Sequence, residues 1–347
     1  MNAAGRGDAR GAEPAASLAE LTDPAVRDLA WLLFSADLLR EQPPRASLAV
    51  PWADAGEAAA VVRWLLTLDR DPAPLHAVLA GNPVTRLGRY AEILLGWFLS
   101  SGPAARLVAA NVPLRRAGRT LGECDFLVAA ADGRRLHWEL AVKYYLHAGG
   151  PQAALADFVG PNLRDRLDLK HAHLLDHQLR LTEREEFASL GYPGPWVAQM
   201  FVKGWLFYAA GASEQAPVCD PSTLAPDHAR GWWVRRSEWA AFARRQAADG
   251  WSVLPRLAWL APRRTAAGAV STVARPVDPA TLLAHLPRED EPVMVAAFVT
   301  EGAPGGHRVS GASGAGTVHV DIERSRGFIV PDDWPERAQA FAREGRA

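Results

Sequence analysis

The sequence contains few cysteines, almost no net charge and no long apolar run. Its two cysteines, Cys124 and Cys219, can form neither a disulfide framework nor a zinc site of four cysteines. The formal net charge of −1 excludes a general attraction to nucleic acid, so a nucleic-acid site would have to be a local patch. Residues 1–16 lack the apolar segment of a signal peptide, and no stretch is long and uncharged enough to span a bilayer. We therefore expect a cytoplasmic protein without a membrane partner.

Lysine is scarce as well, because 35 of the 38 basic residues are arginine. The three lysines are Lys143, Lys170 and Lys203. An ammonium group has a pKa that its surroundings can tune, whereas a guanidinium group stays charged. The chain could therefore keep lysine where an ammonium is needed, although a composition biased towards arginine explains the same count.

The length of 347 residues favours one large or two modest domains. Apolar residues make up 49% of the chain and charged residues 22%, which is typical of a globular protein. We divide the chain into a disordered tail, a helical N-terminal segment, a core, a linker and an α+β region: residues 1–22, 23–84, 85–210, 211–230 and 231–347.

The patterns in the core predict, in chain order, a helix, three strands, a helix and a strand: residues 87–99, 106–114, 121–129, 136–144, 161–181 and 196–208. This order indicates an α/β core. Outside the core we expect a helix that begins at Pro24, with Asp23 as its N-cap. Two further helices are expected over 57–68 and 237–248. Strands are predicted over 293–299 and 318–322, with a Gly-rich loop over 302–316 between them.

Two of the predicted strands form a hairpin that carries two acids. Asp125 lies on a polar face of the first strand, and Glu139 lies on the polar face of the second, opposite a wholly apolar face. A three-residue turn, Ala131–Gly133, places these two acids opposite each other, whereas a two-residue turn breaks the face pattern. Facing carboxylates repel unless a cation or a proton lies between them. Hard oxygen ligands favour Mg²⁺ or Mn²⁺. A solvent-facing surface hairpin is the alternative.

A divalent cation with a lysine nearby suits phosphodiester hydrolysis, because the ion activates water and offsets the charge on phosphate oxygens. Lys143 could align the water or stabilise that charge. Glu92, inside the predicted helix over 87–99, could complete the metal shell or simply lie on the helix surface. His137 could assist proton transfer, although a single strand histidine is more often structural.

Several segments of this core resemble a known family. They read TLGECDFL over 120–127 and HWELAVKYYL over 137–146, followed by GPN at 160–162, DRLDLK at 165–170 and HQL at 177–179. They resemble the bacterial domain-of-unknown-function family numbered 1853, which is grouped with the PD-(D/E)xK nucleases, and the resemblance covers most of the chain after about residue 24. It implies an α/β, restriction-endonuclease-like core with helical N-terminal and mixed α+β C-terminal additions.

The resemblance also implies site residues. Asp125 and Glu139 would bind Mg²⁺ (or Mn²⁺) with Glu92, and Lys143 would join the two acids in catalysis. One position departs from the superfamily pattern: Ala141 stands two residues before the lysine, where an acid is expected. Glu139 lies on the same face about 6.6 Å further back, at about 3.3 Å per residue.

The helix predicted over 161–181 carries the candidate substrate contacts. Arg166, Lys170 and His177 are spaced to share one face, and Gln178 lies on another. In related nucleases a lysine or glutamine of this helix approaches the site or the DNA backbone, whereas a solvated face with helical ion pairs is the alternative. Lys203 lies in an apolar strand and needs a carboxylate partner, which the acid cluster could supply.

A second cluster interleaves aromatic and basic residues: Trp232, Trp233, Arg235 and Arg236. Such a cluster can stack bases and bind phosphates, although core packing explains the tryptophans better.

Two functions of different classes follow. The first is a metal-dependent nuclease that hydrolyses phosphodiester bonds in DNA. The second is a catalytically inactive PD-(D/E)xK domain that binds nucleic acid or a protein partner, and Ala141 favours it. A hydrolase of another phosphorylated substrate is a third candidate. The sequence does not decide whether the protein is an enzyme, nor its oligomeric state.

Overall fold

The computed structural model describes residues 18–210, 218–266, 273–302 and 319–344. Most of the predicted tail and of the Gly-rich loop, and the first part of the linker, lie outside these ranges. The chain forms two compact units. Unit 1 holds the residues up to Tyr144, Asp165–Trp205 and Asp220–Ala229, and unit 2 holds Tyr145–Arg164, Leu206–Cys219 and the residues from Arg230 onward.

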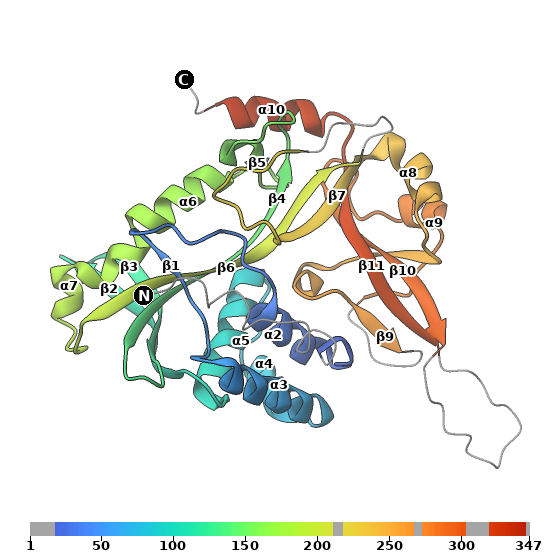
Figure 1. Ribbon diagram of the computed structural model, residues 1–347. Coiled ribbons are helices and arrows are strands. Elements are labelled where there is room, and N and C mark those ends of the chain that lie inside the picture. Colours follow the sequence, from blue (N-terminus) through green and yellow to red (C-terminus); the bar gives the residue numbers. More distant parts are fainter. Residues whose placement is uncertain (1–17, 211–217, 267–272, 303–318, 345–347) are drawn as a thin grey trace, which may run out of the picture. The chain divides into compact units, whose positions relative to one another are not determined.

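Four helices of unit 1 precede strand β2 (Arg106–Arg116) and pack together (Figure 1): α2 (Pro24–Phe34), α3 (Ala55–Arg70), α4 (Ala73–Gly81) and α5 (Leu87–Ser101). The Asp23 carboxylate accepts hydrogen bonds from the backbone N–H groups of Ala25 and Val26, both at 3.0 Å, so the predicted N-cap is confirmed. The sequence patterns also predicted α3 and α5, but they missed α4. This short helix buries only Leu75, so it lacks a continuous apolar stripe.

The strands of unit 1 agree with the predicted ones. They are adjacent in the order β2 (Arg106–Arg116), β3 (Arg119–Ala129), β4 (Arg135–His147) and β6 (Trp196–Ala209). The two-residue strand β1 (Ser47–Leu48) pairs in parallel with β6. Phe126 packs towards Gly96 of α5, whereas its neighbour Leu127 packs with Leu181 and Phe187. Helices therefore cover both faces of β3.

The helix predicted over 161–181 is wrong at both ends. Residues 160–163 form a turn in which Leu163 N–H donates to the Gly160 carbonyl and Leu163 takes a φ of +52°. The helix α6 (Leu167–Asp176) begins only after this turn and ends where His177 leaves helical geometry, with φ −127° and ψ −62°. A 3₁₀ segment, η3 (Gln178–Glu183), and a short helix, α7 (Glu185–Ala188), follow.

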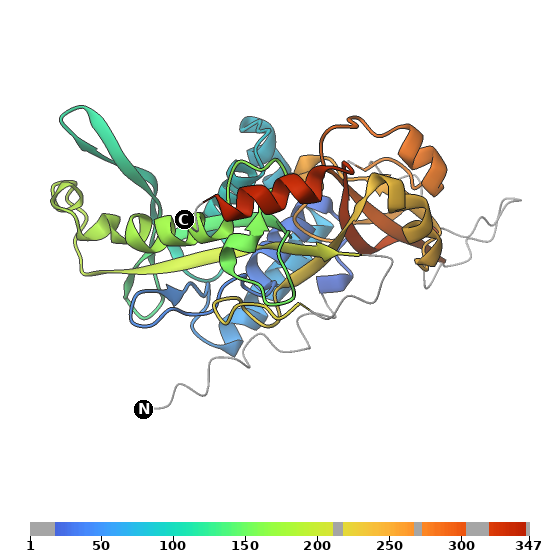
Figure 2. The ribbon, with the colours of Figure 1, turned by 90° about the horizontal axis from the view of Figure 1, so that it is seen from above.

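Unit 2 contains the C-terminal strands and helices. Its strands lie in the order β7 (Ala229–Arg235), β11 (His319–Val330), β10 (Val293–Gly302) and β8 (Gly250–Val253), while β9 (Arg264–Ala266) pairs with β11 and β5 (Phe158–Val159) pairs with the end of β4. Two helices, α8 (Trp239–Arg245) and α9 (Pro279–Ala284), lie side by side (Figures 1 and 2). The last helix is α10 (Trp334–Arg343).

The core of unit 2 is rich in aromatic residues. Trp239 and Phe242 of α8 pack against Trp251 of β8, with ring centroids 4.6 Å apart for the two tryptophans. The helix predicted over 237–248 is shorter than expected, since it begins with a 3₁₀ turn and ends at Arg245. Both units combine helices with strands, so the protein is a mixed α/β protein. Within the described residues, no helix is long and apolar enough to cross a membrane.

Candidate functional site

The hairpin of β3 and β4 has the register predicted from the sequence. Phe126 lies opposite Trp138 and Leu127 lies opposite His137. Ala130 N–H donates to the Arg134 carbonyl at 2.9 Å, which closes a three-residue turn, and Gly133 within it takes a φ of +84°. The turn is therefore of the predicted kind, and its register brings Asp125 and Glu139 together.

The carboxylate of each acid accepts a hydrogen bond from a backbone N–H group of the neighbouring strand. The Leu140 N–H donates to Asp125 Oδ2 at 2.9 Å, and the Asp125 N–H approaches Glu139 Oε1 at 3.4 Å. The last residue pair of the β3–β4 ladder, Phe126 and Trp138, comes directly next to these acids in the sequence. Both carboxylates are thus held between the two strands, with Glu139 fully buried and Asp125 partly buried.

Two further side chains fix Glu139. Gln178 Nε2 donates to Glu139 Oε2 at 2.8 Å, and His137 Nε2 lies 2.6 Å from Glu139 Oε1. Gln178 is the first residue of η3, so the end of α6 at His177 directs this amide towards the acid. Because both oxygens have fixed partners, the carboxylate has one defined orientation.

Burial disfavours ionisation of both acids, and repulsion from Glu139 adds to this effect at Asp125. The pKa of Asp125 is raised from 3.8 to about 8, mainly by burial and also by the negative charges of Glu139 and Glu92, whereas the hydrogen bond from Leu140 lowers it. Burial also raises the pKa of Glu139 from 4.5 to about 8, although the bonds from Asp125 and Gln178 oppose this rise. A cation between the two carboxylates would remove the repulsion, and their hard oxygen atoms fit Mg²⁺ or Mn²⁺.

Lys143 lies on β4 within electrostatic reach of Asp125. Burial lowers the pKa of Lys143, and Lys170 of α6 lowers it further, whereas Asp165 and Asp125 act in the opposite direction. Gly204 of β6 allows a close approach here, because a Cβ at this position would lie 1.9 Å from the Lys143 carbonyl oxygen. The close packing of the two strands therefore fixes the backbone that carries the ammonium group.

Three other predicted site residues have bonding partners of their own. Glu92 of α5 bonds Arg89 at 2.7 Å and lies close enough to affect the pKa of Asp125. His177 has its Nε2 2.9 Å from the Leu121 carbonyl oxygen. Arg166 is 4% exposed and donates two hydrogen bonds to Asp168, at 3.0 and 2.9 Å, so its guanidinium has a structural partner.

The prediction that the acid cluster would partner Lys203 was wrong. The Lys203 ammonium lies 2.9 Å from Asp37 Oδ1 and donates to the Ser35 carbonyl at 2.5 Å. Both partners follow the end of α2, so β6 directs this side chain towards the N-terminal helices. The apolar pattern of the strand showed that a partner was needed but not which segment supplies it.

A softer set of ligands adjoins the two acids. Cys124 Sγ, a ring nitrogen of His137 and a carboxylate oxygen of Glu139 all lie within 4.8 Å of one another. Burial raises the pKa of the Cys124 thiol and lowers that of His137 to about 4, so both groups are neutral at pH 7. Sequence reasoning gave Cys124 no role, because its strand pattern assigned it to the face away from the acids. A sulfur and an imidazole nitrogen suit zinc better than Mg²⁺.

The fold and the site define a mixed α/β protein with a pair of carboxylates, one buried and one partly buried, within electrostatic reach of a lysine. A family model described as "Domain of unknown function (DUF1853)" matches residues 27–330, so the chain belongs to the DUF1853 family. No curated protein and no solved structure matched the chain significantly.

Proposed function

We propose that the protein is a metal-dependent nuclease with a PD-(D/E)xK-like core that hydrolyses phosphodiester bonds in DNA, with Asp125 and Glu139 holding Mg²⁺ or Mn²⁺. The observation that carries this proposal is the placement of both carboxylates between the backbones of β3 and β4. A buried acid and a partly buried acid at such close range are costly without a cation or a proton. A metal-binding function explains why the fold keeps them.

The surrounding residues have distinct roles in this proposal. A bound divalent cation would lower the pKa of water and offset the charge of phosphate oxygens. Gln178 and His137 orient the Glu139 carboxylate, and Glu92 supplies a further carboxylate near Asp125. Lys143, whose pKa burial lowers, aligns the attacking water or donates to a phosphate oxygen.

Lys170 of α6 is a substrate contact in this proposal. It lies within electrostatic reach of Lys143, so the two side chains offer positive charge together. Such a pair suits the phosphate groups of a DNA backbone. His177 is a further substrate contact in this proposal, whereas the buried Arg166 has a positioning role through its bonds to Asp168.

One observation favours a second candidate function, a catalytically inactive domain that binds nucleic acid or a protein partner. Ala141 offers no carboxylate at the position two residues before Lys143. If Glu139 cannot replace that missing acid at the metal, the same fold would bind without cutting.

A cleavage assay separates the two candidates. The purified protein is incubated with single- and double-stranded DNA and Mg²⁺ or Mn²⁺, beside Asp125→Asn and Lys143→Met. Glu123→Gln is the matched control, since Glu123 lies two residues from Asp125 on the same strand but is exposed. Cutting that needs the metal, persists in the control and disappears in both site variants supports the nuclease. Cutting that is the same in wild type and site variants, or no cutting, favours the inactive domain.

A further inference from the structure

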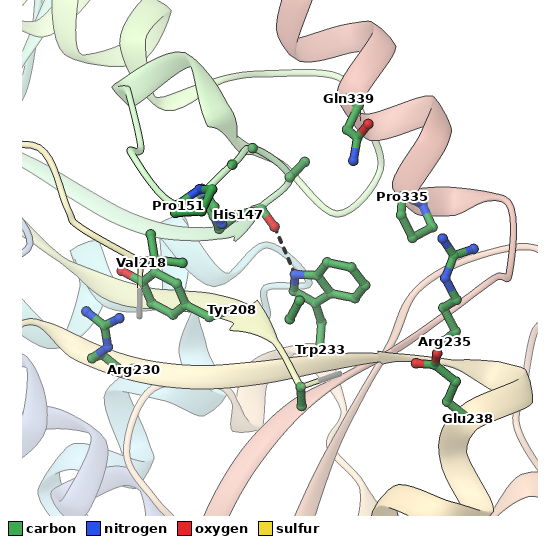
Figure 3. Close-up of a pocket in the computed structure, with 15 residues that line it drawn as sticks. His147, Pro151, Tyr208, Val218, Arg230, Trp233, Arg235, Glu238, Pro335 and Gln339 are labelled. Carbon is green, nitrogen blue, oxygen red and sulfur yellow. Dashed lines mark hydrogen bonds between the residues drawn. The ribbon is translucent and has the colours of Figure 1, made fainter. Parts of the chain in front are cut away.

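Unit 2 contains a cavity of about 600 Å³ (Figure 3). Residues at the ends of β4 and β6, in β7 and in α10 line it, and the side chains that matter here are Tyr208, Arg230, Trp233, Arg235, Glu238 and Gln339. A volume in this range is typical of sites for small molecules and cofactors. The cavity lies wholly within unit 2, whereas the acids of the proposed metal site belong to unit 1.

Two aromatic side chains form a wall of this cavity. The Trp233 indole N–H donates to the His147 carbonyl at 2.9 Å, which fixes the ring plane, and the residue is 9% exposed (Figure 3). Tyr208, at the end of β6, lies on one side of Trp233 in this view, and Arg235 lies on the other. Flat, immobile aromatic surfaces suit a planar ring system, because stacking then costs little side-chain entropy.

Two guanidinium groups accompany this wall. The guanidinium carbon of Arg230 lies 3.8 Å from the centroid of the Tyr208 ring, so the cation is stacked on the aromatic face. Stacking uses the face of a guanidinium, whereas phosphate oxygens bind in the plane of its N–H groups, so one arginine can do both. Arg235 is anchored by Glu336, whose Oε1 lies 2.6 Å from Nη2, and by the Asp332 carbonyl.

We infer that this cavity binds a nucleoside phosphate, with the base against Tyr208 and Trp233 and the phosphate at Arg230. Glu238 and Gln339 line the same cavity and supply a hydrogen-bond acceptor and an amide for the polar edge of a base. An inorganic anion has no ring to stack on the aromatic side chains. An apolar ligand has no charge to pair with the two arginines. The inference is independent of the proposed nuclease function, since no residue of the metal site takes part.

Isothermal titration calorimetry on the full-length protein tests this inference. Nucleoside monophosphates with each base are titrated in EDTA, beside the matching nucleosides and inorganic phosphate. A second arm uses short single-stranded oligonucleotides, which distinguishes a free nucleotide from a nucleotide within a strand. The variants are Tyr208→Leu, which keeps apolar volume without an aromatic face, and Arg230→Ala. Arg324→Ala is the matched control, since Arg324 is an exposed arginine of unit 2 that pairs with Glu301 outside the cavity.

We expect measurable binding of nucleotides but much weaker binding of nucleosides and of inorganic phosphate. Each cavity variant should weaken binding about tenfold, because a single base-stacking or phosphate contact contributes about this much to affinity in other proteins. The control should bind as the wild type does. Binding in the first arm identifies a free nucleotide as ligand, and binding in the second arm alone identifies a nucleic-acid strand. The inference is overturned if neither class binds, if phosphate alone binds equally well, or if the cavity variants bind like the wild type.

Discussion

Replacing Asp125 with asparagine should stabilise the metal-free protein at alkaline pH while removing its response to metal. Folding raises the pKa of Asp125 from 3.8 to about 8, so the folded protein holds this proton more tightly than the unfolded chain. The contribution of the proton to stability is therefore complete below about pH 4 and is lost as the pH rises to about 8. Asparagine has no charge to lose and keeps an oxygen that can accept the Leu140 hydrogen bond.

The size of the effect follows from the same rise in pKa. A tenfold change in a protonation equilibrium corresponds to about 1.4 kcal/mol, so a pKa raised from 3.8 to about 8 costs roughly 6 kcal/mol at most when the carboxyl is fully ionised. Asparagine is itself polar and partly buried, so we expect it to recover about 2 kcal/mol of that loss. For a protein of this size such a gain raises the melting temperature by several degrees.

Chemical denaturation of the metal-free protein at about pH 5, pH 7 and pH 8.5 measures this effect. The wild type should lose stability across this range, whereas the variant should lose clearly less. Glu123→Gln, on the same strand but exposed, should follow the wild type. Mn²⁺ should raise the melting temperature of the wild type and of the control but not that of the variant. A variant that is less stable than the wild type at about pH 8.5, or equally dependent on pH, would refute the reasoning.

Two other predictions concern the groups that position the site. Gln178→Leu removes the donor to Glu139 Oε2, which should raise the pKa of this acid and weaken Mn²⁺ binding about tenfold in calorimetry. An unchanged affinity would show that this amide does not orient the carboxylate. Gly204→Ala forces a Cβ to within 1.9 Å of the Lys143 carbonyl oxygen and should destabilise the fold by about 3 kcal/mol or more in urea denaturation. Gly88→Ala, with open space around its Cβ, is the matched control and should cost nothing.

The local features of the fold were predictable where one segment carries its own signal. The β3–β4 hairpin is such a case, because alternation and an apolar face favour the register that the three-residue turn Ala131–Gly133 produces. The N-cap at Asp23 is another. The prediction of one helix over 161–181 failed because its charged pattern continues through the turn at Leu163 and through the end of the helix at His177. No proline or glycine marks the end at His177.

The candidate site was predictable only in part, because some of its contacts join distant segments. The pair of Asp125 and Glu139 follows from hairpin register alone. The bond from Gln178 depends on where α6 ends, and the partner of Lys203 on how β6 packs, neither of which a strand pattern specifies. Cys124 was missed because simple alternation places it on the face away from the acids, whereas its thiol lies beside Glu139.

The most direct test of the proposed metal site is a crystal structure of the protein soaked with Mn²⁺ and measured for anomalous scattering. A peak with oxygen ligands from Asp125 and Glu139, absent from crystals of Asp125→Asn, is the result that we expect. A peak bound by Cys124 and His137 instead, or no peak at the two acids at saturating Mn²⁺, would contradict the proposal that these carboxylates hold the catalytic ion.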